Sequence, residues 1–322
     1  MKISIITTLL IGVVLTACSS RQPDWVDKPT EQYPQQRYLS AVGEADIRSA
    51  AEDRALANLA KIFAVAVSDR SLDFSQARVS ADQSGDTVSN VQSAARYVTT
   101  EARQILEGAQ LVESWQDADG KTYSLAILEK APAARRLREA VRGADRQIAD
   151  RVDYASQQAP NPVVALAALE QARKTETARS NLNRNLAVVS GQGIKAGHDQ
   201  ASLEKMLRNA LATLHFDAEA DSPELLQNLE SAISTLGITL DKNAPYHLIA
   251  SLDTEPAQLQ QGWYWLRGST QLSLMSQGET MAKKRWPLKV SAVDEGMVGQ
   301  RAKDKLSEQM ADYLYELITS AE

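Results

Sequence analysis

The first twenty residues constrain the chain more than any other stretch, because they fix the compartment in which it folds. The cationic Lys2 precedes an apolar run from Ile3 to Leu15, and two small residues then lead to Cys18. This pattern is typical of a bacterial lipoprotein signal peptide. We therefore predict that residues 1–17 are removed, that the Cys18 thiol becomes a thioether to diacylglycerol in a palmitate-type acylated anchor, and that the body hangs from a membrane.

Two other interpretations of this stretch fit less well. Thirteen helical residues span about 20 Å, which is short of the roughly 30 Å hydrocarbon core that a transmembrane helix must cross. An ordinary secretory signal would be cut at an unusual site, and Cys18 is the only cysteine, so it has no disulfide partner in the chain. Ser19, not aspartate, follows the cysteine, which resembles Gram-negative signals for the outer membrane. We expect an outer-membrane lipoprotein on the periplasmic side.

Composition indicates a globular body and limits the classes of partner that it could bind. The 322 residues include 35 basic and 41 acidic side chains, for a net charge of −6. This acidic balance argues against nucleic-acid binding and provides no polybasic patch for lipid headgroups. No second apolar stretch is long enough to cross a bilayer. A chain of this length has room for two or three small domains.

Residues 18–36 are predicted to form a lipidated tether. They hold three prolines among mostly polar neighbours, which favours an extended segment without a core of its own. Trp25 and Tyr33 interrupt the polar character. They either dock the tether onto the first domain or contact the bilayer interface.

Residues 37–130 are predicted to form a small α/β domain. A strand over 38–42 ends at a turn containing Gly43, and Asp46 is a plausible cap for a helix whose apolar stripe begins at Ile47 and reaches Phe63. We then expect a strand within 65–79, a turn at 82–86 and a helix over 87–106. Asp119-Gly120 predicts the turn of a hairpin over 110–130. Together these elements give an antiparallel sheet backed by helices.

One ordered set of motifs resembles a known family. Pro23-Asp24-Trp25-Val26 is followed by the run from Tyr38 to Ala45, and then by a helix that carries Ala50, Asp53-Arg54-Ala55 and Asn58-Leu59-Ala60. This order is similar to that of the Lpp-twenty lipoproteins, the twenty-kilodalton bacterial lipoprotein family, over about residues 23–130. The resemblance implies an α/β envelope domain with relatives among outer-membrane lipoproteins and flagellar assembly factors. It brings no catalytic residues.

Residues 131–190 are predicted to form an antiparallel helical hairpin broken at Pro160-Asn161-Pro162. Apolar residues from Leu137 to Ala155 recur at spacings of three and four, which indicates a seam against another helix. Six arginines on the first helix suggest phosphate or lipid binding, but four interleaved acids favour a solvated mixed-charge face.

Residues 191–322 are predicted to form a second α/β domain. The glycines at 191–197 lack the Lys-Ser/Thr ending of a phosphate loop and indicate a linker. Helices are expected around 203–214 and 224–236, followed by a three-strand meander and a closing helix over 297–319. The spacing of Arg301, Ala302 and Leu306 repeats that of Arg54, Ala55 and Leu59, which hints at a second copy of a similar unit.

In the C-terminal half of the chain, the middle strand of the meander contains the most specific indication of a binding surface. Alternation places Trp263, Trp265 and Arg267 on the polar face, opposite the residues that point inward. These three side chains are candidates for contact with sugar rings or with a partner's side chains. The alternative is that another helix or the tether covers them.

The sequence provides no signature of catalysis or metal binding. The histidines at positions 198, 215 and 247 are scattered, and no nucleophile elbow is present. We expect no metal, no cofactor and no enzymatic activity. The predicted class is α+β, with two small α/β sandwich units of antiparallel sheet packed on helices, joined by the helical hairpin. The expected function is a non-catalytic interaction or assembly factor for envelope proteins; the alternatives are a glycan- or peptidoglycan-binding module and a flagellar assembly accessory protein.

Overall fold

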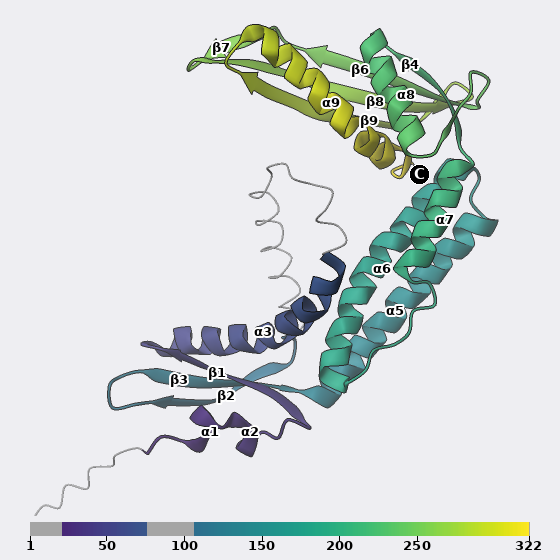
Figure 1. Ribbon diagram of the computed structural model, residues 1–322. Helices are drawn as coiled ribbons and strands as arrows, with labels where there is room; N and C mark the ends of the chain where they lie inside the picture. The colour runs from purple at the N-terminus through teal and green to yellow at the C-terminus, as the bar shows by residue number, and fades with distance from the viewer. Residues whose placement is uncertain (1–20, 76–105, 322) are drawn as a thin grey trace, which may run out of the picture. The chain divides into compact units, whose positions relative to one another are not determined.

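The computed structural model describes residues 21–75 and 106–321, and the chain divides into two compact units (Figure 1). Unit 1 holds the chain up to Leu137 together with Arg184–Gly193. Unit 2 holds Arg138–Asn183 and the chain from Ile194 onward. Both units combine helices with a sheet, which confirms the predicted α+β class.

Unit 1 contains a three-stranded antiparallel sheet in the order β1-β3-β2. Its strands are β1 (Tyr38–Ala45), β2 (Ala109–Gln116) and β3 (Thr122–Glu129). The predicted hairpin joins β2 to β3: Gly120 has a φ of +87°, and the Asp117 carboxylate accepts hydrogen bonds from the Asp119 and Lys121 amides. Because β3 lies in the centre, its residues are buried on both faces of the sheet.

Helices cover both faces of this sheet (Figure 1). The long α3 (Arg48–Ser75) lies on one face, and the short α1 (Asp24–Asp27) and α2 (Pro29–Gln32) lie on the other. Trp25 is buried in one cluster with Leu125 and Ile127, and Tyr33 packs against that cluster. The two aromatic residues therefore dock onto the first domain. The extended conformation expected for this segment is wrong for residues 24–32, because burying Trp25 bends the chain into helical turns.

Two expectations for α3 are wrong. The helix begins at Arg48, beyond Asp46, and Ile47 is 63% exposed instead of facing the core. The strand expected within 65–79 is helical as far as Ser75, since an established helix lengthens at little cost whereas a new strand needs a neighbour to pair with. The turn and helix predicted over 82–105 lie outside the described residues.

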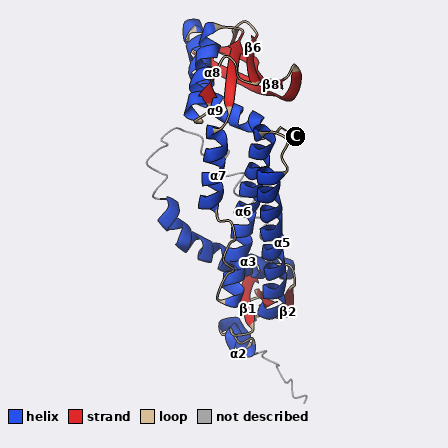
Figure 2. Ribbon diagram, turned by 90° about the vertical axis from the view of Figure 1, so that its right-hand side faces the viewer, coloured by secondary structure: helices blue, strands red, loops and turns tan. Residues whose placement is uncertain are grey.

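The predicted helical hairpin consists of α5 (Lys130–Gln157) and α6 (Pro162–Ser190). Figure 2 shows α7 (Gln200–Ala212) beside these two helices. Within unit 2, Ile148 of α5, Ala172 of α6 and Leu203 of α7 form one buried cluster. Small and branched residues at this crossing allow three helices to approach closely. Asp199 caps α7 by accepting the Ser202 amide.

Unit 2 contains a six-stranded sheet, and helices cover one of its faces. Its strands follow the order β5-β4-β6-β8, with β7 and β9 also paired to β8. Their bounds are β4 (His215–Ala220), β5 (Thr239–Leu240), β6 (Tyr246–Thr254), β7 (Gln258–Gln260), β8 (Trp263–Ser276) and β9 (Glu279–Ala292). The helices α8 (Pro223–Thr235) and α9 (Glu295–Ile318) pack on the sheet over one continuous core.

This sheet is larger than the predicted three-strand meander, and it is not wholly antiparallel. β4 runs parallel to both β5 and β6. A parallel pair needs a crossover connection, and α8 provides it between β4 and β6. The predicted meander corresponds to β6, β8 and β9, and the predicted closing helix corresponds to α9.

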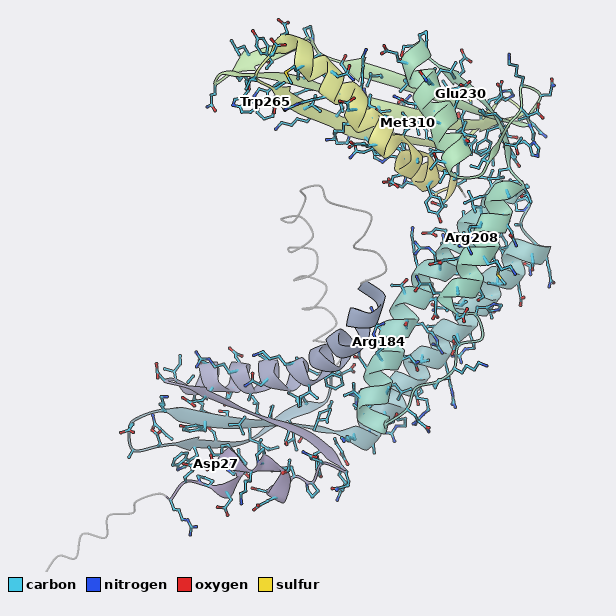
Figure 3. All side chains as sticks on the ribbon, viewed as in Figure 1. Asp27, Arg184, Arg208, Glu230, Trp265 and Met310 are labelled. Atoms are coloured by element: carbon cyan, nitrogen blue, oxygen red, sulfur yellow. The ribbon has the colours of Figure 1, made fainter. Side chains whose placement is uncertain are left out.

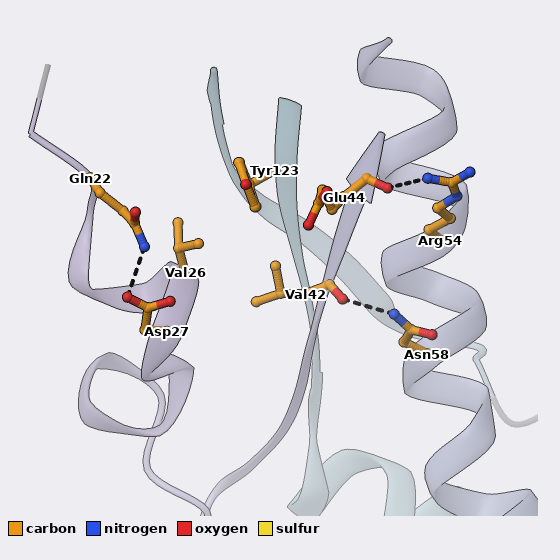
Figure 4. A pocket seen from close by; sticks show the side chains of 8 residues that line it. All are labelled: Gln22, Val26, Asp27, Val42, Glu44, Arg54, Asn58 and Tyr123. Carbon is orange, nitrogen blue, oxygen red and sulfur yellow. Dashed lines mark hydrogen bonds between the residues drawn. The ribbon is translucent and has the colours of Figure 1, made fainter. Parts of the chain in front are cut away.

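Both units contain a strand followed by a helix that caps the free edge of that strand. In unit 1, Arg54 donates to the Glu44 carbonyl at 2.5 Å and Asn58 donates to the Val42 carbonyl at 2.9 Å (Figure 4). In unit 2, the corresponding bonds run from Arg301 to Ser291 at 2.6 Å and from Lys305 to Lys289 at 3.4 Å. The sequence separations are 10 and 16 residues in both cases.

The buried residues of the two capping helices also correspond. Ala51, Ala55, Leu59 and Phe63 of α3 are buried, as are Val298, Ala302, Leu306 and Met310 of α9, at identical spacings. The repeat suggested by three residues in the sequence therefore extends to a shared geometry of strand, turn, helix and caps.

Candidate functional site

β8 alternates between two environments, as its sequence predicts. Thr270, Leu272 and Leu274 are buried beneath the helices, whereas Trp263 and Arg267 on the other parity are exposed. In Figure 3, Trp265 marks β8 and Met310 marks α9; the Met310 side chain is fully buried in the core that α9 covers. The odd-numbered residues of β8 thus belong to the face of the sheet that α8 and α9 leave open.

The three predicted contact residues lie along this open face. Trp263 is 44% exposed, Arg267 is exposed, and Trp265 is half-buried. The Lys289 ammonium lies 4.7 Å from the centre of the Trp265 ring, a cation–π contact that orients both side chains. Lys289 is also the direct cross-strand partner of Arg267.

Cations from β9 extend the open face, and sequence reasoning missed them. Lys283, Arg285 and Lys289 are exposed and share the parity of Pro287 on β9. Arg285 donates to the Asp253 carboxylate at 2.9 Å and to the Ser269 hydroxyl at 2.6 Å. Alternation along β9 could have identified these residues, but only the register between β8 and β9 shows that they face the tryptophans. We give the name cationic face to eight of the outward side chains of β8 and β9, namely Trp263, Trp265, Arg267, Ser269, Gln271, Lys283, Arg285 and Lys289.

A second feature is a polar depression of about 640 Å3 at the edge of β1 (Figure 4). Two of its carboxylates are already bonded. Asp27 accepts a hydrogen bond from Gln22, which also lines the depression, at 2.8 Å, and Glu44 accepts one from Lys121, which does not line it, at 2.5 Å. The donors of Arg54 and Asn58 cap the strand, as described above. Arg54 and Asn58, two polar residues of the family-like motif, therefore stabilise the edge of the sheet.

Unit 2 also buries two ionic clusters. Glu170, which is 2% exposed, accepts two hydrogen bonds of 2.7 Å from Arg173 and one of 2.7 Å from the Tyr315 hydroxyl. Burial acts to raise the pKa of Glu170, but the hydrogen bonds from Arg173 and Tyr315 outweigh it, so this pKa is lowered. Burial, followed by the bond to Glu170, raises the pKa of Tyr315. This cluster ties α6 to α9.

The second cluster joins α5, α6 and the segment before α7. Arg179 donates to Asp145 at 2.8 Å and to the Ile194 carbonyl at 2.9 Å, and it lies 3.7 Å from Glu176. Glu176 Oε2 is buried without a hydrogen bond. Burial raises the pKa of Glu176 to about 6, Arg179 opposes the rise, and Asp145 and Asp199 add to it.

Within residues 21–75 and 106–321, no group of three or more histidine, cysteine, aspartate or glutamate side chains is placed to hold a metal ion. In the same ranges, no helix combines the length and the apolar character needed to span a bilayer. Cys18, the predicted lipidation site, lies outside the described residues.

Comparison with known proteins gives a match to one family model and matches to solved structures of low sequence identity. Residues 23–129 match the model of the LPP20 lipoprotein family. A secreted protein of Helicobacter pylori is 14% identical, with a TM-score of 0.46 over 85% of this chain and 96% of its own. A minor lipoprotein of Acinetobacter baumannii is 16% identical, with a TM-score of 0.27 over 32% of this chain and 90% of its own. No curated protein matches the sequence.

Proposed function

On the premise that residues 23–129 are an LPP20 lipoprotein domain, we propose that the chain is a non-catalytic lipoprotein of the outer membrane that binds other envelope proteins and supports their assembly. Acylation of Cys18 would hold it on the periplasmic side. The observation that carries the proposal is the position of the family domain, which begins five residues after the cysteine of a lipoprotein signal.

The structure supports a binding role in two ways. The side chains that line the depression of unit 1 are engaged in bonds that stabilise the sheet edge, so they support structure instead of chemistry. Unit 2 leaves one whole side of a six-stranded sheet uncovered by its own helices. Such a face is suited to contact with a partner.

Cross-linking in intact cells followed by affinity capture of the full chain tests this function. We expect a defined envelope protein to be recovered with the wild type and lost with Cys18→Ser, which has the same folded body but lacks the lipid that would place it in the outer membrane. Recovery of no protein from wild-type cells, or equal recovery with Cys18→Ser, would contradict the proposal.

A second candidate function is a glycan- or peptidoglycan-binding module. The observation that favours it is the exposure of Trp263 beside the stacked Trp265–Lys289 pair. Aromatic rings on a flat, hydrogen-bonding surface suit the apolar faces of sugars. Co-sedimentation with purified sacculi separates this candidate from the first, since a protein-binding module stays in the supernatant.

A further inference from the structure

The cationic face is positively charged, whereas the protein as a whole has a negative net charge. The chain has a net charge of −6, yet the outward positions of β8 and β9 carry four cations and no acid: Arg267, Lys283, Arg285 and Lys289. Of these, Arg285 is paired with Asp253 from β6, and Lys289 lies over Trp265. Arg267 and Lys283 form no ion pair within the described residues. The face therefore presents positive charge that the fold does not neutralise.

The charges of Arg267 and Lys289 repel each other, although Lys289 also contacts the Trp265 ring. They are direct cross-strand partners, and like charges opposite one another destabilise a sheet. A local choice that opposes the fold is more often found at binding sites than elsewhere. An external anion placed between the two side chains would remove the repulsion, and the planar guanidinium of Arg267 can hold a carboxylate through two parallel hydrogen bonds.

Aromatic rings continue the same surface. Trp265 and Trp263 lie two and four residues from Arg267 on the same side of β8. At about 3.4 Å per residue, the backbone of Trp263 is about 14 Å along the strand from that of Arg267. On the other side of Arg267 along β8, the outward positions hold the polar side chains of Ser269 and Gln271. The site thus combines an anion-binding end with a stacking end on one side of the sheet.

We propose that the cationic face binds an acidic glycan, namely a sugar polymer that carries carboxylates, with Arg267 and Lys289 on a carboxylate and Trp263 and Trp265 on the sugar rings. The inference rests on the second candidate function above and adds the charge of the ligand. The eight residues of the cationic face include no aliphatic side chain, and the centre of a protein–protein interface is usually more apolar than this. We therefore assign these residues to the glycan, and an envelope protein would contact another part of the surface.

Titration of the full lipidated chain in detergent tests the inference. The probes are soluble peptidoglycan fragments that retain their carboxylates and a neutral chito-oligosaccharide of equal length. We expect the acidic fragments to bind more tightly than the neutral probe and to weaken as salt is added. Arg267→Gln combined with Lys289→Gln should weaken acidic binding by about tenfold or more and leave neutral binding almost unchanged. Trp263→Ala should weaken both.

A matched variant controls for the loss of two cations. Lys242→Gln combined with Lys303→Gln removes exposed charges from the loop after β5 and from α9, and it should bind as the wild type does. Thermal unfolding confirms that each variant folds. Equal affinity for neutral and acidic probes, equal losses in both double variants, or retention of an acidic protein but not of the glycan would overturn the inference. An unchanged cross-linked protein partner in that case would leave the first proposed function standing.

Discussion

Gly43 shows how a single residue sets the approach of a strand to its helix. A Cβ at this position would collide with the backbone of Ala51 and Ala55 in α3. The two alanines are fully buried, so α3 has no free space into which it could move away from β1. The sequence contains the glycine and the two alanines in order. Their contact could not be predicted from it, because Gly43 belongs to a strand and the alanines belong to a helix.

We predict that Gly43→Ala destabilises unit 1 by about 1–3 kcal/mol, since the added methyl group forces backbone to move. Hydrogen exchange of the β1 amides measures this loss. Gly299→Ala is the matched control: it lies within α9 with nothing near its missing Cβ, and it should stabilise unit 2 by roughly 0.5–1 kcal/mol. Equal exchange in Gly43→Ala and the wild type would show that the contact is not close.

Glu176 is a buried carboxyl group whose ionisation opposes folding. Burial raises its pKa from 4.5 to about 6, and the nearby Arg179 does not fully compensate. The folded state therefore holds the proton more tightly than the unfolded chain. This contribution to stability is present below about pH 4.5 and is lost as the pH rises through about 6.

We predict that Glu176→Gln makes unit 2 more stable than the wild type by up to about 2 kcal/mol at pH 7. The two proteins should converge as the pH falls below about 4.5, where the wild-type carboxyl becomes protonated in the unfolded as well as the folded state. Urea unfolding at a series of pH values measures the difference. A difference that does not change with pH would mean that Glu176 ionises normally in the folded protein.

At the scale of elements, the capped strand edges explain the polar residues of the motif. β1 and β9 each have one neighbouring strand, and unpaired strand edges are sites for self-association. Side chains from the following helix occupy two carbonyls on each edge. Because both units have these bonds from helix side chains to strand carbonyls, we infer that the bonds help to hold each strand against the helix that follows it.

We predict that Asn58→Ala destabilises unit 1 by about 0.5–1.5 kcal/mol and increases self-association, because it frees the Val42 carbonyl at the edge. Arg48→Ala is the control on the same helix, since it removes only an exposed pair with Glu52 and should cost under about 0.5 kcal/mol. Unfolding and sedimentation measure the two effects. Equal behaviour of the two variants would remove the proposed role of the cap.

Elements with strong local signals could be predicted, and those that depend on pairing could not. The β2–β3 hairpin was predictable because Asp119-Gly120 fits its turn, and α8 was predictable because Ser222 and Pro223 mark its start. β4 was missed because a short strand with alternating acids has little apolar character of its own. The cationic face was half predicted: the β8 residues follow from alternation, whereas the β9 residues require the register.

At the scale of the molecule, the sequence allowed the α+β class and the match to a lipoprotein family model to be predicted, but not which side chains share one face of a sheet. The LPP20 motif was recognisable because its residues serve packing and capping, which constrain their types and order. Domain limits at residues 36, 130 and 190 remain predictions, since the helices α5 and α6 contribute residues to both compact units.

The most direct test of the account is the attachment of lipid at Cys18. Cells are labelled with radioactive palmitate, and the wild type and Cys18→Ser are followed through separation of inner membrane, outer membrane and soluble periplasm. We predict label on the wild type alone, with the wild type in the outer membrane and an uncleaved Cys18→Ser precursor outside that fraction. Equal label on both proteins, or wild-type protein that is unlabelled and soluble, would contradict the account.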